Sequence, residues 1–179
     1  QRLSLFLREF CDKYDFTLVV VSQTEELEEY ANIVYEVQAD ADKQGVPVLK
    51  IGKTIGDVPQ DNFFYTRVKN FQSIVDLSFI YKGFTIIRGP NNSGKSASLR
   101  AIDAILFNNF RVGSYPRKSP DGSKLTTEIT FGYQGKIEED AKEIGLKYKS
   151  NKVMFVIEGE EYYGKSLAAD KLKEAVEEI

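Results

Sequence analysis

The residues most able to do chemistry are eight consecutive ones, Gly89-Pro90-Asn91-Asn92-Ser93-Gly94-Lys95-Ser96. They match the pattern G-x-x-x-x-G-K-[ST] of a Walker A loop. Glycines and small residues let the backbone curl until several N–H groups point inward at phosphate oxygens. The loop therefore predicts a site for the phosphates of a nucleoside triphosphate.

Two side chains of this loop have separate expected roles. Lys95 is expected to reach the β- and γ-phosphates as the catalytic cation, and the Ser96 hydroxyl to coordinate Mg²⁺. A helix that begins here adds free N–H donors and the positive end of its dipole. We therefore predict ATP and Mg²⁺ as cofactors and the whole of Gly89–Ala97 as nucleotide-binding.

The same pattern occurs again at Gly159-Glu160-Glu161-Tyr162-Tyr163-Gly164-Lys165-Ser166. Its two carboxylates would lie beside a triphosphate, and its two tyrosines would crowd the place where the backbone must approach. We interpret this segment as a turn over 158–164 with an alternating Glu-Tyr strand.

Hydrophobic periodicity predicts the elements that must hold the loop, on either side of a connector at 52–61. Before it we expect a helix over 2–14, a doubly buried strand over 16–21, a short acidic helix after Thr24, and strands over 33–37 and 46–51. After it we expect strands over 63–68, 74–79 and 84–87, a helix over 94–107, a loop over 108–123, an exposed strand over 125–133, a strand over 152–157 and a helix over 167–179. This mixture predicts an α/β fold.

Composition excludes several chemistries within the chain. The absence of histidine rules out histidine-ligated zinc and a Ser-His-Asp triad. One cysteine, Cys11, indicates a reducing compartment. No apolar run approaches 18 residues and the N-terminus has no signal-peptide layout, so we expect a cytoplasmic protein with no membrane partner.

Charge is concentrated in the middle of the chain. Residues 62–125 hold 10 Lys and Arg against 3 Asp and Glu, whereas the whole chain has a net charge of −3. An anionic ligand, nucleotide or DNA, is expected there, with a solvated charged face as the alternative. Within the basic loop 111–124 we expect Arg117 and Lys118 to touch DNA phosphates.

Residues 65–107 resemble the N-terminal lobe of the SMC/SbcC/RecF group of ABC-type ATPases. That family has a strand, an Asn-Phe-basic-Ser segment, a second strand, Gly-x-Asn-x-Ser-Gly-Lys-Ser and a helix. Here the segment is Asn70-Phe71-Gln72-Ser73. Gln72 replaces the usual basic residue, so a phosphate contact from that position is in doubt. Residues 153–163 resemble the strand and turn of the same lobe's β-subdomain, so the resemblance covers 62–179.

Residues 1–51 resemble the part of a P-loop ATPase that follows the Walker B strand. The run Leu18-Val19-Val20-Val21-Ser22-Gln23 is similar to the switch strand of the SMC group. That group usually has histidine where Gln23 stands, so the resemblance implies a variant γ-phosphate sensor. A RecA/DnaB-type core also has a strand ending in Ser-Gln, and a polar strand end without a ligand is the third interpretation.

The resemblance implies a P-loop NTPase fold with an ABC/SMC-like antiparallel β-subdomain, divided into a C-terminal-lobe-like segment (1–54), a connector (55–61) and an N-terminal lobe (62–179). It implies an ATP-binding head acting on DNA in break repair, recombination or chromosome organisation. Implied partners are DNA, a second ATPase head and an SbcD-type nuclease. No Walker B strand ending in Asp-Glu and no signature motif is evident; Val153–Glu158 is a loose Walker B candidate. The alternatives are a RecA/DnaB-like helicase or recombinase segment and a nucleotide-binding switch without turnover.

Overall fold

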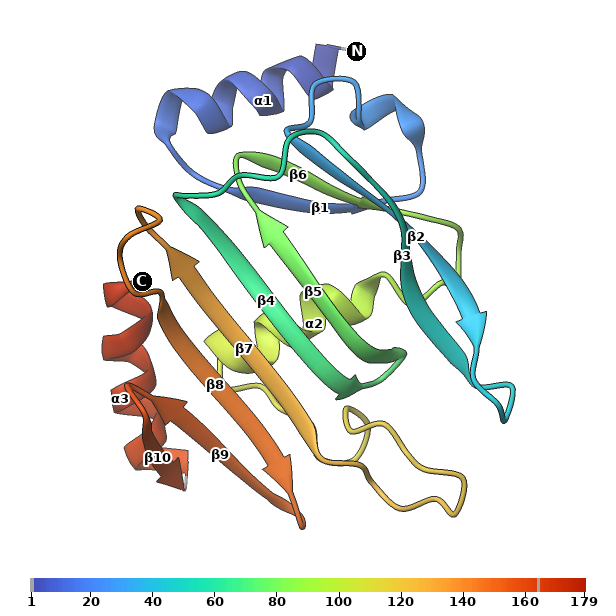
Figure 1. The fold of residues 1–179 in the computed structure, drawn as a ribbon, viewed down its shortest axis with the longest axis vertical. Coiled ribbons are helices and arrows are strands. Elements are labelled where there is room, and N and C mark those ends of the chain that lie inside the picture. The colour runs from blue at the N-terminus through green and yellow to red at the C-terminus, as the bar shows by residue number, and fades with distance from the viewer. Residues whose placement is uncertain (1, 164) are drawn as a thin grey trace.

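The chain folds into two β-sheets with α-helices packed on their faces, as a computed structural model of residues 2–163 and 165–179 describes (Figure 1). In chain order the elements are α1 (Arg2–Tyr14), β1 (Leu18–Ser22), the 3₁₀ turn η1 (Glu25–Leu27), β2 (Ile33–Ala41), β3 (Pro47–Ile55), β4 (Phe63–Phe71), β5 (Ile74–Tyr81), β6 (Phe84–Arg88), α2 (Ser96–Leu106), β7 (Thr127–Gln134), β8 (Lys142–Lys149), β9 (Lys152–Ile157), β10 (Glu160–Tyr163) and α3 (Lys165–Glu178). The predicted α/β class is confirmed.

The strand that leads into the glycine loop lies inside a four-stranded sheet of order β1-β6-β2-β3. Strand β6 runs parallel to both neighbours, and its first four residues are buried. Such a continuous apolar run is typical of a parallel strand covered on both faces. Ser22 of β1 and Glu36 of β2 both pair in register with Arg88 of β6. The carboxyl ends of these three strands therefore meet at one edge of the sheet.

Strand β1 was predicted to be buried on both faces, and this prediction is wrong. All five of its residues are partly exposed, because β1 pairs with β6 alone and occupies the edge of the sheet. Helix α1 covers one face, with Leu7 and Cys11 packed in a small apolar cluster that includes Phe84 and Ile86. The edge of β1 that faces away from β6 is paired with no other strand in the described part of the chain.

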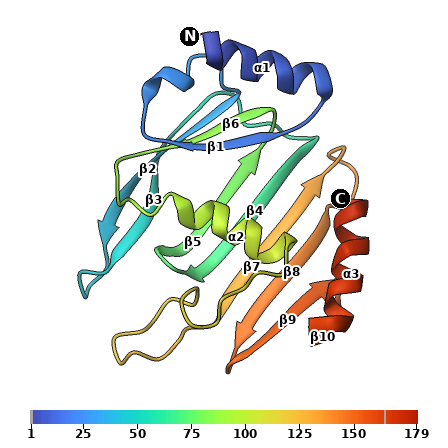
Figure 2. The same ribbon diagram turned by 180° about the vertical axis from the view of Figure 1, so that it is seen from behind.

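The second sheet has six antiparallel strands in the order β10-β9-β8-β7-β4-β5. Helix α2 lies across it and α3 lies beside β9 and β10 (Figure 2). Strand β7 was predicted to be exposed, but it is an interior strand with Thr127, Ile129 and Phe131 buried, because β4 and β8 pair with its two edges. Strand β8 was not predicted, since its lysines and Gly145 mask the apolar alternation of Ile144, Leu146 and Tyr148.

Several predicted boundaries shift in the hairpin of β2 and β3. Both strands are longer than predicted. Strand β3 continues through residues 52–55, where the sequence predicts the start of the connector. The acidic helix expected after Thr24 is only the 3₁₀ turn η1. Cross-strand pairing from Ala41–Pro47 to Val34–Ile55 accounts for the extension, because backbone hydrogen bonds compensate for the polar composition.

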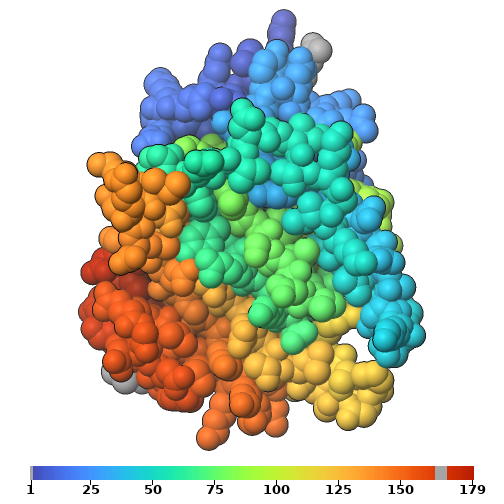
Figure 3. All heavy atoms as spheres, in the orientation of Figure 1, coloured from blue at the N-terminus to red at the C-terminus, as the bar shows by residue number. Residues whose placement is uncertain are grey.

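One apolar core joins the two sheets. It contains Ile33 and Leu49 from the first sheet, Phe71 and Phe79 from the second, and Ala101 from α2, all at most 1% exposed. Figure 3 shows the resulting surface, with the α1 segment at one end of the molecule and the β8–α3 segment at the other. Residues from both sides of Gly56 are therefore packed into a common interior.

Candidate functional site

The glycine loop connects the end of β6 to the start of α2 at the carboxyl edge of the parallel strands (Figure 2). Its backbone turns through left-handed conformations at Asn92 (φ 61°) and Gly94 (φ 87°). Glycine is required at two places by close approach. A Cβ on Gly89 would lie 2.4 Å from the carbonyl oxygen of Val37, and one on Gly94 would lie 2.2 Å from Ser73 Oγ. Both distances are far inside van der Waals contact, so the loop is fitted against β2 and the β4–β5 turn.

The loop has the free N–H groups that an anion site needs. Ser93 N donates to Pro90 O at 3.3 Å, and Ala97 N donates to Gly94 O at 2.9 Å. Among the described residues, no hydrogen bond outside the regular elements occupies the N–H groups of Gly94, Lys95 or Ser96. Helix α2 begins at Ser96, so these donors lie at its positive end. This geometry suits phosphate oxygens.

Lys95 is the cationic residue of the loop, and it is buried, with 7% of its surface exposed. Its Nζ donates to the carbonyl oxygen of Pro90 at 2.6 Å, and burial lowers the pKa of its ammonium group. An ammonium held in such surroundings is poorly hydrated, so it gains most from an incoming anion. Ser96 is exposed, with its hydroxyl on the first helical residue.

The structure brings Gln23 and the loop into one cleft. The cleft has a volume of about 640 Å³ and is lined by Val21, Ser22, Gln23, Thr24, Asn91, Asn92, Gly94, Lys95, Ser96 and Arg100. Of the predicted site residues, Gly89, Pro90, Ser93 and Ala97 do not line it. Ser93 and Ala97 are each 1% exposed, and no partner of Ser93 Oγ is found among the described residues. Gly89 is half-buried and Pro90 is exposed, so both belong to the loop outside the lining.

The lining contains two cations and no carboxylate. Within residues 2–163 and 165–179, no three acidic or cysteine side chains gather closely enough to hold a metal ion. Three hydroxyl-bearing residues line the cleft, Ser22, Thr24 and Ser96, and Ser96 is the one at the start of α2. Outside the lining, Arg88 at the end of β6 pairs with Glu25 at 2.7 Å, with Glu28 at 3.0 Å and with Glu36.

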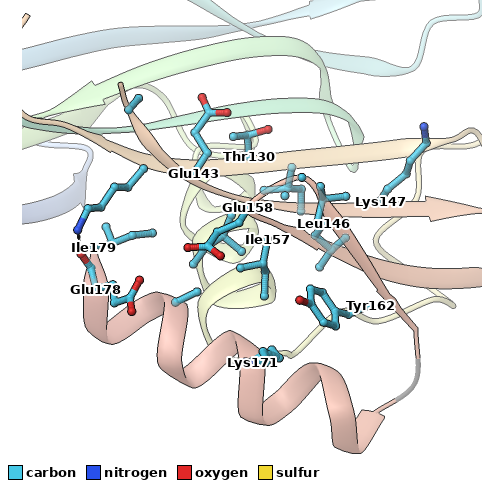
Figure 4. A pocket seen from close by; sticks show the side chains of 18 of the residues that line it. Thr130, Glu143, Leu146, Lys147, Ile157, Glu158, Tyr162, Lys171, Glu178 and Ile179 are labelled. Carbon is cyan, nitrogen blue, oxygen red and sulfur yellow. Dashed lines mark hydrogen bonds between the residues drawn. The ribbon is translucent and has the colours of Figure 1, made fainter. Parts of the chain in front are cut away.

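Over the residues that the structure describes, the second glycine pattern consists of a turn and the strand β10, as predicted, and of the first residues of α3. Glu158 (φ 52°) and Gly159 (φ 81°) make the turn, and β10 pairs antiparallel with β9. Gly164 lies outside the described residues. Glu158, Gly159 and Tyr162 line a separate cavity of about 890 Å³ between α3 and the six-stranded sheet (Figure 4). The loose Walker B candidate, which ends at Glu158, is thus in the antiparallel sheet and does not line the loop's cleft.

The predicted role of Arg117 in binding DNA is wrong, because its side chain is 6% exposed and fully engaged. Its Nη2 lies 2.7 Å from Asp42 Oδ2, and its Nη1 donates to Pro47 O at 3.2 Å and to Gln72 O at 3.0 Å. A basic residue in a loop is expected from the sequence to be exposed. Here hydrogen bonds to two backbone carbonyls and a carboxylate stabilise the guanidinium in a buried position. Lys118 is exposed, as expected.

Arg100 was missed by the sequence prediction although it lines the cleft. The signal was its spacing: residues four apart share one face of a helix, so Arg100 follows Ser96 toward the cleft. From the sequence, the turn at Gln72 and Ser73 drew attention only because Gln72 stands where the resembled family has a basic residue. Its contact with the loop through Ser73 comes from the tertiary structure.

Among the described residues, every helix falls short of the length and apolarity that a membrane span requires. No curated protein matches the chain. The family model of an AAA domain matches residues 66–178, which begin in β4 and include the glycine loop and α2. With a P-loop NTPase fold and a match over most of its length, the chain belongs to this AAA-domain family of P-loop ATPases.

Proposed function

We propose that the chain is the ATP-binding part of an SMC/SbcC-like ATPase head that acts on DNA. The observation that carries the nucleotide site is the loop Gly89–Ser96, which offers free N–H donors and the buried Lys95 to one cleft without any carboxylate. The N–H donors at the helix end and the charge of Lys95, with no carboxylate among the described lining residues, favour a polyphosphate. Lys95 contacts the β- and γ-phosphates, and Ser96 supplies a hydroxyl to Mg²⁺, which neutralises charge on the phosphates.

Gln23 is proposed as the residue that senses the γ-phosphate. Gln23 comes directly after β1, and the glycine loop comes directly after β6. The two strands end at the same edge of the sheet, so Gln23 and the loop line the same cleft. The amide of Gln23 can orient a water or a terminal phosphate oxygen, as a glutamine does in other P-loop enzymes. On this proposal residues 1–54 act as a C-terminal-lobe-like segment, 55–61 as the connector and 62–179 as the N-terminal lobe.

The carboxylate that hydrolysis requires is proposed to come from another segment of the protein or from a second head. The open edge of β1 is the position where a further parallel strand extends the sheet, and its carboxyl end would reach the cleft beside Gln23. DNA, a second ATPase head and an SbcD-type nuclease are the proposed partners, in the cytoplasm. The chain alone is expected to bind ATP better than it hydrolyses it.

Calorimetric titration with Mg-ATP tests the nucleotide site. The parent chain should bind, and Lys95→Ala should bind at least about 100-fold more weakly, because a buried charge-assisted contact to the phosphates is lost. Lys165→Ala, the equivalent change in the second glycine pattern, is the matched control and should bind like the parent. Equal loss in both variants, or unchanged binding by Lys95→Ala, would refute the assignment of the site.

Salt-dependent DNA binding tests the DNA part of the proposal. Lys118 and Lys124 are exposed in the loop between α2 and β7 and carry no carboxylate partner among the described residues. Replacing both with Gln should weaken binding of duplex DNA and reduce the slope of log K against log salt by about two. Lys13→Gln on α1 is the control, and an unchanged slope in the double variant would place the DNA interface elsewhere.

A RecA/DnaB-like segment is the second candidate, favoured by one observation. Strands β1 and β2, both from residues 1–54, flank β6 as its two parallel neighbours in one sheet, as a continuous RecA-like core requires. Mass photometry separates the two: ATP-dependent dimers support the SMC/SbcC-like head, whereas hexamers or filaments support the RecA/DnaB-like segment. Binding without turnover in the assembled complex would instead indicate a nucleotide switch.

A further inference from the structure

Arg100 is a cation at the cleft, and no carboxylate in the described part of the chain forms an ion pair with it. It lies on α2, one turn after Ser96, and lines the cleft together with Gln23 and Lys95. Among the described residues, its Nη1 donates a hydrogen bond to Gln72 Oε1 at 3.2 Å. A guanidinium has five N–H donors, so most of them remain available after this bond.

Gln72 is held rigidly enough to orient that guanidinium. It occupies the β4–β5 turn in a left-handed conformation (φ 48°). Its backbone N donates to Tyr115 O at 2.8 Å, and its backbone O accepts from the buried Arg117 at 3.0 Å. The neighbouring Ser73 is packed against Gly94 of the glycine loop. The backbone that carries the amide of Gln72 is thus fixed relative to the loop.

We propose that Arg100 binds the polyphosphate chain of the nucleotide, and that Gln72 is a positioning residue that directs its guanidinium into the cleft. The inference rests on the proposed nucleotide site and extends it by a second phosphate-binding cation. The planar fork of a guanidinium binds two phosphate oxygens in a fixed bidentate geometry, whereas an ammonium such as Lys95 acts as a point charge. The cleft then offers the phosphates Lys95 and the N-terminal end of α2, with Arg100 one turn further along the same helix.

Calorimetry with two probes, Mg-ATP and inorganic tripolyphosphate, tests the role of Arg100. Arg100→Gln should weaken the binding of both probes by the same factor, about 10- to 100-fold, because one charge-assisted contact to phosphate is lost. Arg111→Gln is the matched control: it removes the same charge from an exposed arginine that stacks on Tyr115 and does not line the cleft. It should bind both probes like the parent.

A double-mutant cycle tests the role of Gln72. Gln72→Gly removes the amide but keeps the turn, because glycine tolerates the positive φ at this position. It should weaken Mg-ATP binding about threefold to tenfold in the parent and leave Arg100→Gln unchanged, since the two residues act as a unit. A loss of equal size in both backgrounds would show that Gln72 only supports the fold.

Three outcomes would overturn the inference. Parent-like affinity of Arg100→Gln, with binding abolished in Lys95→Ala, would remove Arg100 from the site and leave the proposed function standing. Weakened ATP binding with unchanged tripolyphosphate binding would assign Arg100 to the base or ribose. No binding of either probe by the parent would overturn the proposed function as well.

Discussion

Replacing Gly94 with alanine should both destabilise the chain and abolish Mg-ATP binding. The new Cβ would meet Ser73 Oγ at 2.2 Å and Ser73 Cβ at 2.9 Å, and the residue would have to keep a φ of 87°. A non-glycine residue with positive φ costs about 1–2 kcal/mol, and overpacking adds about 1–3 kcal/mol. Urea unfolding followed by circular dichroism should therefore show a loss of about 2–5 kcal/mol, and calorimetry should show no nucleotide binding.

Two further variants separate the clash from the backbone strain. Gly113→Ala introduces the same methyl group in another loop, where nothing lies within 4 Å, and should leave stability and binding unchanged. Adding Ser73→Gly to Gly94→Ala removes both clashing atoms and should recover the part of the stability that the clash cost. If Gly94→Ala alone unfolds at the urea concentration of the parent, the close packing of the loop on the β4–β5 turn is refuted.

Replacing Arg117 with methionine should lower the free energy of unfolding by at least about 2 kcal/mol, because Asp42 and two backbone carbonyls lose the buried donor that joins them. These carbonyls belong to Pro47 in β3 and Gln72 in the β4–β5 turn, so Arg117 ties the first sheet to the second. Methionine keeps much of the side-chain volume, which limits the effect of a cavity. Urea unfolding of the variant and the parent measures the difference.

The pH dependence of the difference in unfolding free energy between the parent and Arg117→Met shows how much of it comes from the ion pair with Asp42. Hydrogen bonds from the backbone N–H of Val46, together with the Arg117 guanidinium, hold the pKa of Asp42 below its ordinary value. A depressed carboxyl pKa contributes stability above the unfolded value of about 3.9, and this stability is lost as the pH falls further. The gap between parent and Arg117→Met should therefore narrow below about pH 4. Arg111→Met is the control, and a stability equal to the parent's in Arg117→Met would contradict the buried role.

The extent of the family match has a structural consequence. It covers residues 66–178, whereas both parallel neighbours of β6 come from residues 18–41. Without them the most fully buried of the described strands would expose both of its edges, at a cost set by unpaired backbone groups. The glycine loop therefore depends for its position on a segment that lies outside the matched residues.

The amino-acid sequence by itself determined the elements whose local pattern is strong. The loop Gly89–Ser96 is defined by residue types that its backbone requires, and the strand before it and the helix after it follow from apolar periodicity. The α1 helix and the β4–β5 pair were predicted for the same reason and are confirmed. The second glycine pattern was correctly separated from the first over its described residues, because bulky and acidic side chains do not suit a phosphate site.

Only the tertiary structure decided which residues from distant segments meet. Gln23 reaches the cleft because β1 lies parallel to β6 with their carboxyl ends in register. Arg117 is buried because Asp42 and two carbonyls from other strands converge on it. The edge position of β1 and the interior position of β7 likewise depend on pairing partners. Local periodicity reports which side of an element is apolar, but strand order and register arise from contacts between residues far apart in sequence, which no local pattern contains.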